Sequence, residues 1–177
     1  MRKITVVLLA CMLWARADQI SVFKLGEFEY TGQTIAVVPY DCGNSQLCED
    51  IEEVFDELMF DRFDDNYLEP RKLRKALKQA RLDELDEENM AAVANHLKAD
   101  VFLRLDLEIE EVAGVGRRMD DDELGGEDAS QLIQAVMVLV DPATSKELLT
   151  VKSVGKGEST ESLLRERFEE LFRLAFE

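Results

Sequence analysis

Histidine is nearly absent from this 177-residue chain, in which His96 is the only one. The chain also lacks a G-x-S-x-G nucleophile motif, an H-E-x-x-H zinc motif and a phosphate-binding P-loop. A lone histidine beside the apolar face of a predicted helix is more often a surface or half-buried structural residue than a catalytic one. The sequence therefore predicts no catalytic residue, no cofactor site and no metal site, and we expect a protein that is not an enzyme.

Basic residues are also few. The chain has 21 lysines and arginines against 38 aspartates and glutamates, which gives a formal net charge of −17 at pH 7. A surface this acidic disfavours nucleic acid and anionic lipid as binding partners. The simplest role of this negative charge is to keep the protein soluble. The functional alternative is that it binds a basic protein partner or divalent cations.

Long apolar runs are scarce as well. The run Ile4–Trp14 has eleven residues, whereas a membrane-spanning helix needs about 20, and no second long run follows. A basic pair precedes this run and Ala15-Arg16-Ala17 follows it, an order typical of a secretory signal peptide. We therefore expect residues 1–17 to be cleaved and residues 18–177 to form a single exported, periplasmic domain with no transmembrane span.

Cys11 leaves an alternative to this cleavage. It follows Leu8-Leu9-Ala10, which loosely matches the processing site of bacterial lipoproteins. Acylation of Cys11 would make the protein an outer-membrane lipoprotein instead of a released periplasmic one.

Cys42 and Cys48 are the two cysteines left after cleavage. An even pair in an oxidising compartment predicts a disulfide, and closing so small a loop contributes about 2 kcal/mol. Their C-x5-C spacing differs from the C-x-x-C spacing of redox motifs, so we interpret the pair as structural.

The spacing of apolar residues predicts nine elements in the order strand, strand, helix, helix, helix, strand, strand, strand, helix. The predicted strands are Ile20–Tyr30, Thr34–Asp41, Val101–Glu110, Leu132–Val140 and Leu148–Val154, and the helices begin near Leu47, Pro70, Asp86 and Ser159 or Thr160. This order predicts an α/β (mixed α+β) fold with a mixed five-stranded sheet and grouped helices. One parallel crossover precedes an antiparallel meander and a C-terminal helix.

Two of the predicted strands differ in how they are buried. Alternation over Val101–Glu110 predicts one face in water. The nearly continuous apolar run Leu132–Val140 predicts a strand that is buried on both faces.

Two charged segments are candidate binding sites. The helix predicted after Pro70 is the only basic element in the chain, and it offers an interaction face for an acidic partner, although a solvated outer face is the simpler interpretation. Four cations make up this candidate interaction face: Arg71, Arg74, Lys75 and Lys78. The acidic run Asp120–Glu123 leaves cation binding open, although its consecutive carboxylates do not have the alternate spacing of a calcium loop.

Three short segments carry a resemblance: Ile35–Tyr40, Leu97–Leu105 and Val136–Leu149. Together they resemble a superfamily of bacterial envelope α/β domains. It includes the amino-terminal domain of TolB, the LpoB-like outer-membrane activators of penicillin-binding proteins and the periplasmic domain of CsgG. The family turn has glycine where this chain has Ser145. The resemblance implies a periplasmic domain that works by protein contacts, and it carries over no catalytic residue.

The sequence therefore favours an exported, non-enzymatic interaction domain that supports envelope assembly or transport, or regulates an envelope enzyme. Its partner would be another envelope protein, and its oligomeric state is left open. Two alternatives remain at this point: a periplasmic hydrolase that uses acidic residues, and a protein that binds a cation or small ligand near Asp120.

Overall fold

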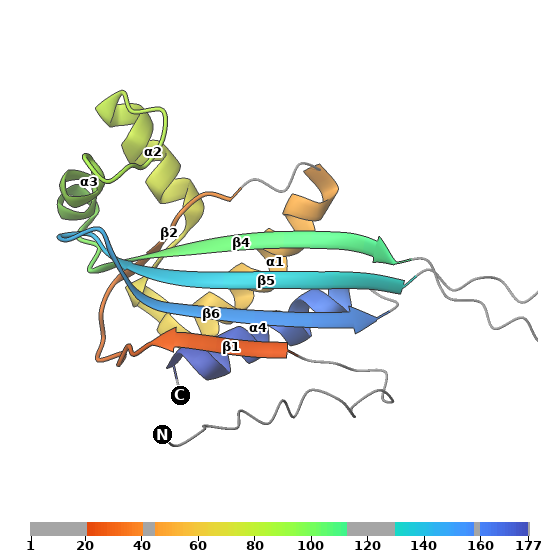
Figure 1. Cartoon of the computed structure of the whole chain (residues 1–177). Helices are drawn as coiled ribbons and strands as arrows, with labels where there is room; N and C mark the ends of the chain where they lie inside the picture. Colours follow the sequence, from red (N-terminus) through yellow and green to blue (C-terminus); the bar gives the residue numbers. More distant parts are fainter. Residues whose placement is uncertain (1–20, 41–44, 113–129, 158–159, 177) are drawn as a thin grey trace, which may run out of the picture.

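A computed structural model describes residues 21–40, 45–112, 130–157 and 160–176 (Figure 1). Predicted signal residues 1–17, Cys11 and Cys42 lie outside these ranges, as does the acidic run Asp120–Glu123. The described elements are, in order, β1 (Ser21–Gly26), β2 (Ile35–Val37), α1 (Ser45–Phe63), a 3-10 turn (Asp64–Asn66), β3 (Tyr67–Leu68), α2 (Pro70–Ala80), α3 (Met90–Leu97), β4 (Val101–Val112), β5 (Ser130–Asp141), β6 (Lys146–Gly157) and α4 (Thr160–Phe176).

One mixed sheet contains all of these strands, in the spatial order β1-β6-β5-β4-β2-β3. β2 runs parallel to β3 and to β4, whereas the pairs β4–β5, β5–β6 and β6–β1 are antiparallel. The predicted fold class, the crossover to β4, the meander and the C-terminal helix are all confirmed. The predicted count of five strands was one short, because β3 has only two residues and is too brief to show an alternating pattern.

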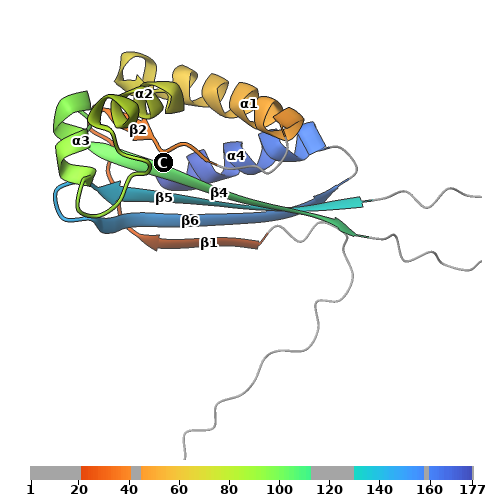
Figure 2. The same ribbon diagram turned by 90° about the horizontal axis from the view of Figure 1, so that it is seen from above.

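The main core lies between the sheet and the helices α1 and α4, which run along the same face (Figure 2). Phe55 of α1 is fully buried, with ring centroids 5.2 Å from Phe168 and 5.5 Å from Phe172 of α4. Phe63 and Phe176 extend the contact with centroids 4.8 Å apart. These aromatic side chains recur at helical spacing, so each helix presents a continuous apolar stripe to the other.

A second, smaller core lies on the opposite face of the sheet, and α2 and α3 cover only one end of that face. Leu73 and Leu77 of α2 and Val93 of α3 pack there against Phe102 of β4 and Val140 of β5. Three acids further along the same face of β4 are exposed: Asp106, Glu108 and Glu110. The predicted water-facing side of this strand is therefore confirmed beyond the end that the helices cover.

β5 is less buried than its sequence predicts. Val138 and Val140 are buried beneath the α2–α3 layer, but Leu132 and Val136 on the same face are only half-buried. The prediction that all of Leu132–Val140 is buried on both faces was wrong, because α2 and α3 are too short to reach the other end of the strand.

The β5–β6 hairpin turns at Asp141–Thr144. Asp141 Oδ1 accepts the Ala143 N–H at 2.9 Å, and its Oδ2 accepts the Thr144 hydroxyl at 2.7 Å. These two bonds hold the pKa of Asp141 below its usual range. Ser145 closes the turn with a φ of 55°, a left-handed conformation that favours glycine.

Arg167 of α4 is buried against β6, with 1% of its surface exposed. Its Nη1 donates hydrogen bonds to Ser153 Oγ and to the Val154 carbonyl at 3.4 Å each. Its Nη2 donates a hydrogen bond to the carboxylate of Glu166. A Cβ added to Gly155 would lie 2.7 Å from the guanidinium carbon, so the absent side chain at Gly155 makes the space that Arg167 occupies.

Candidate functional site

The α2–α3 layer contains the candidate interaction face. α2 begins at Pro70, whose fixed φ suits the first helical position, and it ends where Arg81 adopts φ 59°. Asp86 starts the turn into α3 by accepting the N–H groups of Glu88 and Asn89 at 2.9 Å each. The two helices predicted to begin near Pro70 and Asp86 are therefore confirmed, although α3 itself begins at Met90.

All four cations of the predicted face lie on the exposed side of α2. Arg71 and Arg74 reach Glu52 of α1, with Nη2 to carboxylate distances of 3.7 and 3.6 Å. These ion pairs contribute little free energy, because both arginine side chains are largely exposed to water, although Glu52 is only 23% exposed. Lys75 and Lys78 are exposed and have no ion pair with an acid among the described residues.

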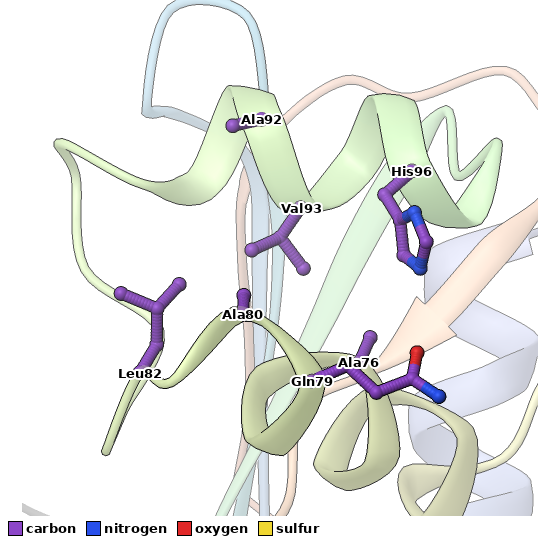
Figure 3. Close-up of a pocket in the computed structure, with 7 residues that line it drawn as sticks. All are labelled: Ala76, Gln79, Ala80, Leu82, Ala92, Val93 and His96. Atoms are coloured by element: carbon purple, nitrogen blue, oxygen red, sulfur yellow. The ribbon is translucent and has the colours of Figure 1, made fainter.

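A cavity of 310 Å³ lies between α2 and α3 (Figure 3). Its lining is mostly alanine, valine and leucine, contributed by both helices, and Gln79 and His96 add polar atoms. A space of this size, with few polar groups, suits one bulky apolar side chain or a small apolar ligand. His96 lies at this cavity and is exposed, which agrees with its interpretation as a surface residue.

A second hollow, of 430 Å³, lies on the other side of α2. Val38 and Pro39, which follow β2, form one wall, and Arg74, Lys78 and the segment Leu82–Leu85 form the rest. Hollows therefore flank the basic helix on both sides: a mainly apolar one towards α3, and one that mixes apolar and charged residues on the other side. Sequence reasoning missed both hollows, because alanines and turn residues at a helix contact give no sign of the space between elements.

Beneath the amino-terminal half of α2 lies a polar cluster that the sequence did not indicate. The Tyr67 hydroxyl donates to a carboxylate oxygen of Asp56, and the Tyr40 hydroxyl is buried without a hydrogen-bond partner among the described residues. Burial raises the pKa of Tyr40, Tyr67 and Asp56, and Glu52 raises those of Tyr40 and Asp56 further. Both phenols therefore stay protonated at neutral pH, as hydrogen-bond donors and not as nucleophiles.

The remaining predicted site residues are not brought to this layer. Cys48 lies in the first turns of α1, and its predicted partner Cys42 is outside the described residues, so the disulfide stays a prediction. The same holds for acylation at Cys11 and for cation binding at Asp120–Glu123. Within the described ranges, no three histidine, cysteine or acidic side chains converge as metal ligands do. In the same ranges, no helix has both the length and the apolar character to cross a membrane.

Comparisons with known proteins give structural neighbours only. No protein-family model matches the chain, and no curated protein matches its sequence. The structure of the PelC dodecamer from Paraburkholderia phytofirmans superposes with a TM-score of 0.59 and 12% identity, over 89% of this chain and 99% of that one. Lipoprotein GNA1162 from Neisseria meningitidis superposes with a TM-score of 0.50 and 15% identity, over 79% of this chain and 95% of that one. At such low identity the likeness is one of fold, and this chain shares its α/β fold with two bacterial proteins, one of them a lipoprotein.

Proposed function

We propose that this chain is an exported, non-enzymatic protein-interaction domain of the bacterial cell envelope. In this proposal it belongs to the superfamily of TolB amino-terminal, LpoB-like and CsgG periplasmic domains. It supports envelope assembly or transport, or regulates an envelope enzyme, through its α2–α3 layer. The observation that carries the proposal is a basic helix, on an otherwise acidic chain, with a mainly apolar hollow on one side and a hollow of mixed apolar and charged lining on the other.

These features match the composition of protein interfaces. Interfaces combine apolar anchor pockets with charged residues around them. The cavity of 310 Å³ holds one apolar anchor, and Lys75 and Lys78 lie on the same helix to attract acidic groups of the partner. The chemistry of the layer therefore fits an acidic protein surface that presents a bulky apolar side chain.

Two further observations support the cellular setting. The predicted signal peptide over residues 1–17 would export the chain, and one structural neighbour is a lipoprotein. The other neighbour is a dodecamer, so the fold is compatible with work through protein contacts.

The test is cross-linking in intact envelopes, comparing the native chain with the Arg74→Glu/Lys78→Glu variant. We expect the variant to lose the cross-linked partner, because it reverses two charges of the basic helix that line its second hollow. A matched control, Lys146→Glu/Arg173→Glu, reverses two exposed cations on β6 and α4 and should keep the partner. A partner that is captured equally by all three proteins would remove α2 from the interaction.

The intact mass of the exported protein tests the setting separately. Cleavage after Ala17 and acylation at Cys11 give different masses. A mass that includes residues 1–17 without acylation would contradict export by this signal.

A further inference from the structure

Among the described residues, no helix covers this face beyond α2 and α3, and this uncovered end of the sheet carries a stripe of acids. Asp106, Glu108 and Glu110 alternate along β4 on the face that, at its other end, carries Phe102 beneath α2 and α3. Successive same-face residues on a strand are about 6.6 Å apart, so the three carboxylates span about 13 Å. One face of one strand therefore carries the α2–α3 layer at its start and a row of negative charge at its end.

The outer side of α2 carries the complementary charge. Arg71, Lys75 and Lys78 are spaced by four and three residues, and this spacing places them on one side of the helix, opposite the buried Leu73. The distance from Arg71 to Lys78 along the helix axis is about 11 Å. The cations therefore extend over about 11 Å on α2, and the acids over about 13 Å on β4.

Apolar surface accompanies the acids. Phe23 and Leu25 of β1 are 54% and 62% exposed, and Phe23 belongs to the same cross-strand row as Lys152, Val136 and Asp106. α3 contains no lysine, arginine, aspartate or glutamate, and its Ala91 and Ala92 are exposed beside α2. β6 carries Lys152 and Lys156 on this face, so the apolar surface lies on β1, and the α2–α3 layer has a basic part for the stripe on β4 and an apolar part for Phe23 and Leu25.

We infer that the uncovered end of this sheet binds the α2–α3 layer of a second copy of this chain. The inference rests on the proposed function and names the partner of that layer. In a dimer with two-fold symmetry this basic-on-acidic contact occurs twice. A second copy of this chain carries the same acidic stripe, and it therefore supplies the negative charge that the cations of α2 bind.

Charge exchange between the two surfaces tests this dimer. One variant of the full exported chain, Lys75→Glu/Lys78→Glu, reverses the charge of α2. A second variant, Glu108→Lys/Glu110→Lys, reverses the charge of the stripe on β4 and keeps the 3.2 Å ion pair between Arg104 and Asp106. Sedimentation velocity measures self-association of each. We expect each variant to weaken the native association at least tenfold, and the variant with all four changes to regain it.

Matched controls keep the result specific. Asp61→Lys/Glu169→Lys changes the net charge as much as the stripe variant but lies on α1 and α4, and it should associate as the native chain does. Far-UV circular dichroism confirms that each variant is folded. If the stripe reversal unfolds the sheet, Glu108→Gln/Glu110→Gln replaces it, with a smaller expected loss.

The inference is overturned if the native chain stays monomeric, or if the dimer survives charge reversal on either surface. It is also overturned if the variant with all four substitutions does not regain the association. The envelope cross-linking separates these results from failure of the proposed function. If the native chain is monomeric but captures another protein that Arg74→Glu/Lys78→Glu loses, the second copy is rejected and the interaction domain stands. If the chain dimerises by charge exchange and captures no other protein, the inference stands and the envelope partner is rejected.

Discussion

The contact between Arg167 and Gly155 gives a sharp test of how α4 packs on β6. Gly155→Ala places a Cβ 2.7 Å from both Cζ and Nε of Arg167, which is shorter than any relaxed contact. The guanidinium cannot move away freely, because Nη1 is held by Ser153 Oγ and the Val154 carbonyl and the residue is 1% exposed. Overpacking of a buried site costs roughly 1–3 kcal/mol, and we expect the loss of unfolding free energy to fall in that range.

The cost should depend on Arg167 itself. Arg167→Met keeps an unbranched apolar stem but removes the charge, whose acidic partner Glu166 has a half-exposed side chain. Replacing a buried ion by an apolar group is often neutral or stabilising, so we expect this change alone to cost little. In the Met background Gly155→Ala should lose most of its cost, which gives a coupling free energy of about 1–2 kcal/mol between the two positions.

Urea denaturation followed by circular dichroism measures the four unfolding free energies of this cycle. Gly157→Ala serves as the control, because its Cβ would lie 2.9 Å from Leu163 and not against Arg167, so its cost should be the same in both backgrounds. Additivity of Gly155→Ala and Arg167→Met within about 0.5 kcal/mol would refute the reasoning.

The remaining predictions concern other parts of the chain. Ser145→Gly should raise the unfolding free energy by roughly 0.5–1 kcal/mol in urea titrations, because φ 55° strains every residue except glycine, and an unchanged midpoint would contradict this. Burial raises the pKa of Asp56, so its ionised form costs stability that is recovered as pH falls through that raised pKa. Asp56→Asn should therefore be at least as stable as the native chain at pH 7, with a smaller gain on acidification in pH-dependent melts. A larger gain would reverse the assigned sign. Cys42→Ser/Cys48→Ser should lose about 2 kcal/mol relative to the oxidised native chain, and reductant should abolish the difference. An identical stability of the two oxidised proteins would exclude the bridge.

Much of the fold could be predicted from local patterns. The apolar steps of three and four in α1 and α4 predict which sides pack together, because side chains at that spacing share one helix face. Alternation in β4 predicts its water-facing side from Arg104 onward, and Pro70 marks the start of α2. Each of these signals lies within a few residues, so no contact with a distant segment is needed to interpret it.

Other features depend on contacts between distant segments. β3 is a strand only because Tyr67 and Leu68 pair with Ile35 and Ala36. Val136 is half-buried and Val138 buried, although both are valines two positions apart, because the α2–α3 layer ends between them. Nothing in the sequence around Arg167 indicates burial, since its space exists only where β6 has glycine opposite α4.

The candidate site shows the same division. The basic composition of α2 is visible in the sequence, and so is its apolar side through Leu73 and Leu77. The hollows on both sides of α2, and the attraction of Arg71 and Arg74 to Glu52, follow from how α1, α2 and α3 pack.

The sequence by itself determined the elements, the mixed α/β class and the concentration of positive charge in one helix, because periodicity and composition are local properties. Tertiary structure alone decided that α2 and α3 cover only one end of one sheet face. That outcome depends on the length of short helices relative to the long strands β4 and β5, and on which strands lie beneath them. It leaves Asp106, Glu108 and Glu110 in water at the other end, where a surface for a partner exists only because the fold stops covering it.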